Sequence, residues 1–103
     1  MWAQLISTRL KPGQDGGLER LAQQLQAIEQ PGSGLVRSTM MRDQKDPGRV
    51  HMLVVFESEE HARARENDPK RQAGLQEARA TMADIFDGPP EFTDLGIVLE
   101  YTP

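Results

Sequence analysis

The sequence contains no cysteine, which excludes disulfide bonds, thiolate metal sites and cysteine nucleophiles. Aromatic residues make up only 5% of the 103 residues and hydrophobic residues 37%, so little material is available for a large core. No apolar stretch approaches the length of a membrane-spanning helix, and the start of the chain lacks the basic and apolar regions of a signal peptide. The net charge of -4 argues against a dedicated nucleic-acid binder. We therefore predict a cytoplasmic protein with no nucleic-acid or membrane partner.

Several motifs of known chemistry are also missing. The glycines before residue 20 do not follow the spacing of a dinucleotide-binding loop, and no nucleophile elbow is present. The two histidines, His51 and His61, are ten residues apart on different predicted elements and lack a metal-ligand spacing. The sequence therefore predicts neither a bound cofactor nor a metal site.

What the sequence does contain is a series of periodic segments separated by turns. Apolar residues at spacings of three and four, from Leu18 to Ile28, predict a helix. Apolar residues at every second position over 94–101 predict the last strand: Leu95, Ile97, Leu99 and Tyr101. Apolar runs bounded by turn residues predict three further strands, over residues 2–11, 35–42 and 50–56.

A second helical region begins after Ser58 and contains a break. Ser58 precedes Glu59 and Glu60, which is typical of an N-cap followed by acidic residues at the positive end of the helix dipole. Proline is poorly tolerated inside a helix, so Pro69 predicts a break. Asp68 then caps a second helical segment with Pro69 at its first position.

These segments give the order β-α-β-β-α-β, which is the ferredoxin-like α+β plan. We predict a single domain over residues 1–103, in which the helices cover one face of a four-stranded antiparallel sheet. In the last three predicted strands, apolar residues occupy both odd and even positions, so both faces of the sheet would be apolar. The face without helices would then mark an interface. We therefore predict a homodimer whose two sheets pack face to face across a two-fold axis.

The stretch from Val54 to Ala64, VVFESEEHARA, carries a resemblance to a known family. An aromatic residue (Phe56), the Glu-Ser pair, an acidic helix start and Pro69 soon after resemble the pattern of the antibiotic biosynthesis monooxygenase (ABM) family. The element order resembles that of the family over nearly the whole chain. This resemblance implies a dimeric α/β barrel built from two ferredoxin-like subunits. Where members often carry Trp and His, this chain has Phe56 and Arg65.

The resemblance implies three alternative functions. The first is a cofactor-independent monooxygenase that acts on an aromatic or polyketide-like small molecule. The second is a non-catalytic dimer of the same fold that binds a small apolar ligand or regulates, which the missing Trp and His favour. The third is a haem-binding or haem-degrading protein; such relatives use an Asn on the first strand, and the first strand here has none. Whether the protein is an enzyme is therefore left open by the sequence.

Three residues are candidates for catalysis: His51, Arg37 and Tyr101. His51 could move protons near neutral pH, and Arg37 could pair with a substrate carboxylate or enolate. The Tyr101 ring could stack on an aromatic substrate. Each has a structural alternative: a hydrogen-bonded strand histidine, an ion pair of Arg37 with Asp94 or Glu100, and ordinary packing of the tyrosine.

Four further residues are candidates for the lining of a ligand pocket: Trp2, Met40, Phe56 and Met82. Trp2 lies on the first strand, and terminal strands can approach each other in a ferredoxin-like sheet. The methionines are soft side chains that suit the lining of a pocket. Packing in the core or at the dimer interface is the alternative for all four.

Overall fold

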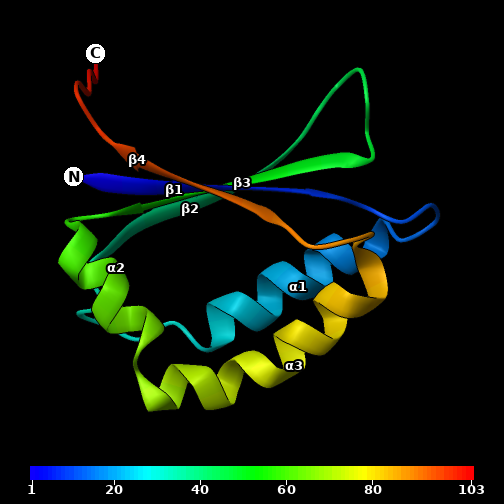
Figure 1. The fold of residues 1–103 in the computed structure, drawn as a ribbon, viewed down its shortest axis with the longest axis horizontal. Coiled ribbons are helices and arrows are strands. Elements are labelled where there is room, and N and C mark those ends of the chain that lie inside the picture. Colours follow the sequence, from blue (N-terminus) through cyan, green and yellow to red (C-terminus); the bar gives the residue numbers. More distant parts are fainter.

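The computed structural model describes residues 1–103 and places three helices on one face of a four-stranded antiparallel sheet (Figure 1). The strands lie in the order β2-β3-β1-β4 across the sheet. This arrangement confirms the predicted ferredoxin-like α+β fold. The elements are β1 (Trp2–Arg9), α1 (Gly16–Ala27), β2 (Leu35–Arg42), β3 (Arg49–Phe56), α2 (Glu59–Glu66), α3 (Pro69–Ile85) and β4 (Glu91–Gly96).

Register in the sheet decides which side chains face the helices. Trp2 pairs with Phe56 across β1 and β3, and Ile6 pairs with Met52. Because side chains alternate along a strand, the even-numbered residues of β1, β3 and β4 face the helices and the odd-numbered residues face away. The register of β2 shifts by one residue between Leu35 and Arg37, which is a β-bulge at Val36.

The helix boundaries follow from capping side chains. The Ser58 hydroxyl accepts a hydrogen bond from the His61 N–H at 3.2 Å, and the Asp68 carboxylate accepts one from the Lys70 N–H at 3.0 Å. Pro69 opens α3, so the predicted caps and break are confirmed. None of the three helices is both long and apolar enough to cross a membrane.

Two separate hydrophobic clusters form the core. The larger cluster lies between α1, α3 and the end of the sheet where β1 ends and β3 begins, and the smaller one lies beneath α2. Close approach of α1 to α3 depends on small residues: a Cβ atom on Gly17 would lie 2.4 Å from Ile85 Cγ2. The larger cluster comprises Leu10, Leu18, Leu21, Val50, Ala78 and Ile85, and the smaller one Val54, Phe56 and Ala62.

The C-terminal segment, residues 97–103, leaves the sheet and extends beyond it (Figure 1). The predicted last strand was therefore wrong beyond Gly96. Gly96 pairs with Trp2, the first residue of β1, so the following residues have no strand left to pair with in this chain. Val98 is 98% exposed and Leu99 84% exposed.

Candidate functional site

A cavity of about 790 Å³ lies between the sheet and the helices. We call it the sheet–helix cavity. Hydrophobic side chains account for 17 of its 29 lining residues. All four predicted pocket residues are in the lining: Trp2, Met40, Phe56 and Met82.

The walls of the sheet–helix cavity follow from the register of the sheet and the amphipathic faces of the helices. Even-numbered strand residues line the cavity on the side of the sheet, together with Leu35, which precedes the bulge of β2. On the other side, α1 and α3 contribute aliphatic side chains such as Leu25 and Leu75. The rings of Trp2 and Phe56 lie 6.2 Å apart, centroid to centroid, at an interplanar angle of 48°. The resulting wall of aromatic, aliphatic and thioether groups suits a flat apolar molecule.

The edge strand β4 and the loop before it contribute to the lining of the cavity. Phe92 lies on this strand, lines the cavity and is 60% exposed. Gly88 and Pro90, in the loop before the strand, also belong to the lining. The lining of the cavity therefore reaches the molecular surface at β4.

None of the three candidate catalytic residues lines the cavity. His51 faces away from the helices, where its Nδ1 lies 2.8 Å from the Ser7 hydroxyl. Arg37 pairs with Glu100 at 3.5 Å, one of the two partners considered from the sequence. Tyr101 is 84% exposed in the C-terminal segment. His51 is therefore a hydrogen-bonded strand histidine and Arg37 a member of an ion pair, which are the structural alternatives considered for them from the sequence.

Charged side chains meet at the end of the cavity near α2. Glu29 Oε1 accepts hydrogen bonds from Arg65 Nε at 3.0 Å and from Arg65 Nη2 at 2.5 Å. The Arg65 guanidinium also lies 5.2 Å from the centroid of the Phe56 ring. Arg71 Nη1 is 4.0 Å from the same Glu29 oxygen, too far for a hydrogen bond. We call Glu29, Arg65 and Arg71 the charged cluster.

The two arginines of the charged cluster differ in their hydrogen bonding. Arg71 Nη1 is buried without a hydrogen-bond partner, and the Arg71 side chain is only 11% exposed. Burial, followed by the positive charge of Arg65, lowers the pKa of Arg71 from its ordinary value. For Glu29, burial favours the neutral form, but hydrogen bonds from Arg65 and Ser33 outweigh it and lower the pKa.

A smaller pocket of about 220 Å³ lies on the other side of the charged cluster. The loop over residues 28–33 and the side chain of His61 form much of its wall. Glu29, Arg65 and Arg71 line both this pocket and the sheet–helix cavity. The charged cluster is therefore the partition between the two spaces.

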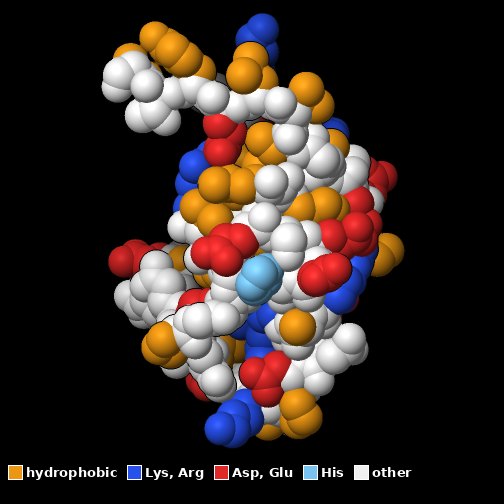
Figure 2. Space-filling model, turned by 90° about the vertical axis from the view of Figure 1, so that its left-hand side faces the viewer, with side chains coloured by type: hydrophobic (Ala, Val, Ile, Leu, Met, Phe, Trp, Pro, Cys, Tyr) orange, Lys and Arg blue, Asp and Glu red, His pale blue; other side chains and the backbone are white.

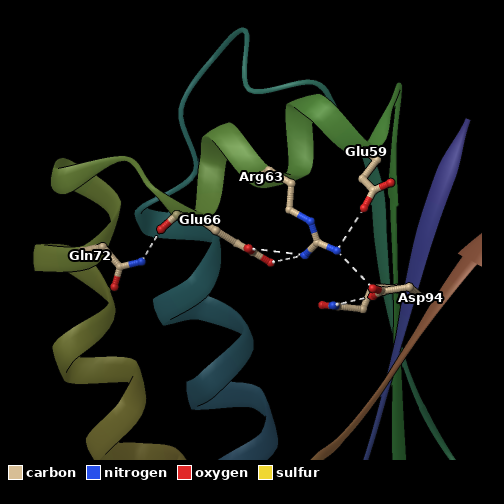
Figure 3. A network of polar contacts seen from close by, with 6 residues as sticks. Glu59, Arg63, Glu66, Gln72 and Asp94 are labelled. Carbon is tan, nitrogen blue, oxygen red and sulfur yellow. Dashed lines mark hydrogen bonds and ion pairs between the residues drawn. The ribbon is translucent and has the colours of Figure 1, made fainter.

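An ion-pair network ties α2 to the edge of the sheet (Figure 3). Arg63 pairs with Glu59 and Glu66, both at 3.1 Å, and with Asp94 of β4 at 3.0 Å. Its guanidinium lies 5.1 Å from the centroid of the Trp2 ring. The network places a cation over an aromatic wall residue and holds α2 against β1 and β4.

The end of the molecule that carries α2 and the termini exposes much apolar surface. Figure 2 shows hydrophobic side chains gathered over the end of the sheet and along the protruding segment at the top. Acidic side chains surround the histidine in the middle of this face. No group of three or more His, Asp and Glu side chains is arranged to hold a metal ion.

Sequence reasoning missed the charged cluster. Arg65 and Arg71 stand among alternating charges that are typical of a solvated helix face. One signal was available, because Arg65 occupies a position where the resemblance leads one to expect His. Nothing in the sequence indicates the approach of Glu29, which lies in the turn after α1 and reaches α2 and α3 only through the packing of the helices.

The profile of one protein family, described as antibiotic biosynthesis monooxygenase, matches residues 1–77. No curated protein sequence matches this one.

Solved structures with this fold come from several bacteria. One is a candidate antibiotic biosynthesis monooxygenase from Nitrosomonas europaea, with a TM-score of 0.74, 18% identity, and coverage of 96% of this chain and 100% of that one. Another, from Bordetella bronchiseptica, has a TM-score of 0.74 and 22% identity, with coverage of 95% of this chain and 97% of that one. A variant of MhuD with two manganese protoporphyrin IX molecules bound per active site has a TM-score of 0.81 and 17% identity, with full coverage of both chains.

Proposed function

Because the chain belongs to the antibiotic biosynthesis monooxygenase family, we propose that its sheet–helix cavity binds a flat aromatic or polyketide-like molecule and oxygenates it without a cofactor. The observation that carries this proposal is the cavity itself. It has room for a molecule of several fused rings, and its lining is mostly hydrophobic.

The proposed reaction takes its electrons from the substrate. An electron-rich phenol that loses its proton becomes a phenolate, which can transfer electrons to dioxygen. One atom of dioxygen becomes the second quinone oxygen and displaces the hydrogen of the ring carbon to which it binds. This hydrogen and the phenol hydrogen leave with the other oxygen atom as water, so the phenol gives up four electrons and dioxygen accepts four. The cavity's contribution is to hold the ring in one orientation and to exclude bulk water from the reacting carbon.

Oxygen uptake with a panel of hydroxylated polycyclic aromatics tests the activity. Ala22 and Gln23 are neighbours on α1, but only Ala22 lines the cavity. We expect Ala22→Phe to abolish uptake by filling the space, and Gln23→Phe to retain it. Absence of uptake across the panel with the native protein would overturn the oxygenase.

The second candidate function is a non-catalytic dimer that binds the same kind of ligand. The observation that favours it is the absence of histidine and tyrosine from the cavity lining, which leaves no neutral-pH proton carrier of the usual kind in the wall. Ligand binding without oxygen uptake would support this candidate over the enzyme.

A haem ligand is the weaker alternative. The MhuD variant of similar fold holds manganese protoporphyrin IX. In this chain no histidine, cysteine or tyrosine lines the cavity, so the usual axial ligands of haem iron are missing apart from methionine. Haemin titration without a Soret shift would exclude this alternative.

We also propose that the protein is a homodimer joined through the face of the sheet that the helices leave uncovered. This face carries Leu5, Leu53 and Leu95 at odd-numbered positions. The C-terminal segment adds exposed apolar side chains beside it. A second copy would cover both by two-fold symmetry. The cytoplasmic location stays a prediction from composition.

A further inference from the structure

Charge in the sheet–helix cavity has the opposite sign to the charge of the whole chain. The chain has a net charge of -4, yet the cavity lining contains three arginines and two glutamates. One of these glutamates, Glu66, is already paired with Arg63, which lies outside the lining. When the paired Glu66 is left out, three arginines face one glutamate, so the lining of the cavity carries a net positive charge.

This surplus is concentrated in the charged cluster. Glu29 accepts two hydrogen bonds from Arg65, whereas Arg71 Nη1 stays 4.0 Å from the same carboxylate oxygen. One carboxylate thus stands between two guanidinium groups, and Arg71 keeps a buried donor without an acceptor. An unpaired buried donor is costly, and a second carboxylate would remove that cost.

The position of the cluster shows which part of a ligand it would meet. Arg65 lies against the Phe56 ring, and Phe56 lies against Trp2, so the charges adjoin the aromatic end of the cavity. A flat ring placed against Trp2 and Phe56 would have its edge near the guanidinium groups. Arginine binds carboxylates through a planar fork of donors that fits both oxygens.

We propose that the sheet–helix cavity takes a flat aromatic molecule that carries a carboxylate, and that Arg71, supported by Arg65, binds this carboxylate. The inference rests on the proposed function, because it requires that the cavity is the ligand site. It narrows the ligand class from apolar aromatic molecules to aromatic acids. Arg71 is then a specificity-determining residue.

A second buried polar atom without a partner lies at the other end of the cavity. Thr8 Oγ1 lines the space there, beside Val50 of the larger core cluster. Thr8 is six residues from Trp2 along β1, about 20 Å at the usual rise of a strand. Its hydroxyl suits a keto or hydroxyl group far from the acid, and it should have no part in recognising the carboxylate.

Trp2 provides the measurement, because it is the only tryptophan and lines the cavity. The probes are 9-anthracenecarboxylate and its neutral match, 9-anthracenecarboxamide, which absorb where tryptophan emits. Quenching of Trp2 and calorimetry give both affinities. We expect the native protein to bind the carboxylate at least tenfold more tightly than the amide, about 1.4 kcal/mol.

Variants of the arginines and of Thr8 test which residue causes the preference for the carboxylate. We expect Arg71→Gln to reduce it to threefold or less while the affinity for the amide stays within twofold. Arg71→Lys should keep part of it, because the charge remains and the planar fork is lost. Arg79→Gln, on the same helix and also in the lining, and Thr8→Val are the controls that should keep it.

The outcomes separate this inference from the proposal beneath it. Equal binding of both probes to the native protein would overturn the acid preference and leave the cavity as the ligand site. A preference that survives undiminished in Arg71→Gln would overturn the role of Arg71. If neither probe binds, the proposed function falls together with this inference.

Discussion

Glu29 and Arg65 join the end of α1 to α2 through two hydrogen bonds that share one carboxylate oxygen. Both side chains are largely buried, with 24% and 17% of their surfaces exposed. The pair fixes the loop after α1 against α2. Its contribution to stability depends on the charge of Glu29, and therefore on pH.

Replacing Glu29 should reveal that dependence. The folded-state pKa of Glu29 lies below its ordinary value of 4.5, so the pair stabilises fully above about pH 4.5 and loses its effect as the pH falls through the folded pKa. We expect Glu29→Gln to lower the free energy of unfolding by about 2 kcal/mol at pH 7. The difference should vanish at low pH in urea titrations. Glu19→Gln, at an exposed position on α1, is the control.

A methyl group at Gly17 should be costly. Its Cβ atom would collide with Ile85, which is fully buried and has no room to move. We expect Gly17→Ala to destabilise the protein by about 2 kcal/mol. Thermal unfolding measures the effect. Gly16→Ala meets no atom within 4 Å, so an equal loss in that control would contradict the explanation.

The cap of α2 can be tested alone. Ser58→Ala removes the hydroxyl that accepts the His61 N–H, and we expect a loss of about 1 kcal/mol in the free energy of unfolding. Ser58→Asp offers a carboxylate to the same N–H and should restore most of the stability. Failure of aspartate to do so would mean that the hydroxyl acts through its contact with the His61 ring instead.

Opposite faces of β4 should respond differently to a charge. Leu95 lies on the uncovered face, and Phe92 lies on the face toward the helices. We expect Leu95→Glu to convert the proposed dimer into a monomer, because the proposed interface would bury an unpaired carboxylate. Phe92→Glu should leave the dimer intact in sedimentation velocity. A native protein that is monomeric at micromolar concentration would refute the dimer.

Much of the fold was predictable because its signals are local. Ser58, Asp68 and Pro69 fixed helix boundaries through their own hydrogen-bonding and steric properties. The end of β4 at Gly96 was not, because a strand needs a partner as well as alternation. Alternation continues beyond Gly96, where β1 is no longer beside it.

The site was only partly predictable, for a related reason. His51 shares its parity with Leu53 and Val55, and apolar residues occupy both parities of β3. Alternation along a strand assigns its residues to two faces of the sheet, but it does not show which face the helices cover. His51 is therefore a candidate on the sequence, although its side chain faces away from the cavity in the structure. The charged cluster requires contacts between α2, α3 and the turn after α1, which no single segment encodes.

The two hydrophobic clusters of the core imply two levels of local stability. Ala62 is the only buried residue of α2, whereas α1 and α3 each bury three residues. The break at Pro69 separates these elements along the chain. We therefore expect the amides of α2 to exchange with deuterium through local opening, and those of α1 and α3 only through global unfolding. Such opening of α2 would uncover the aromatic end of the cavity while the rest of the molecule stays folded.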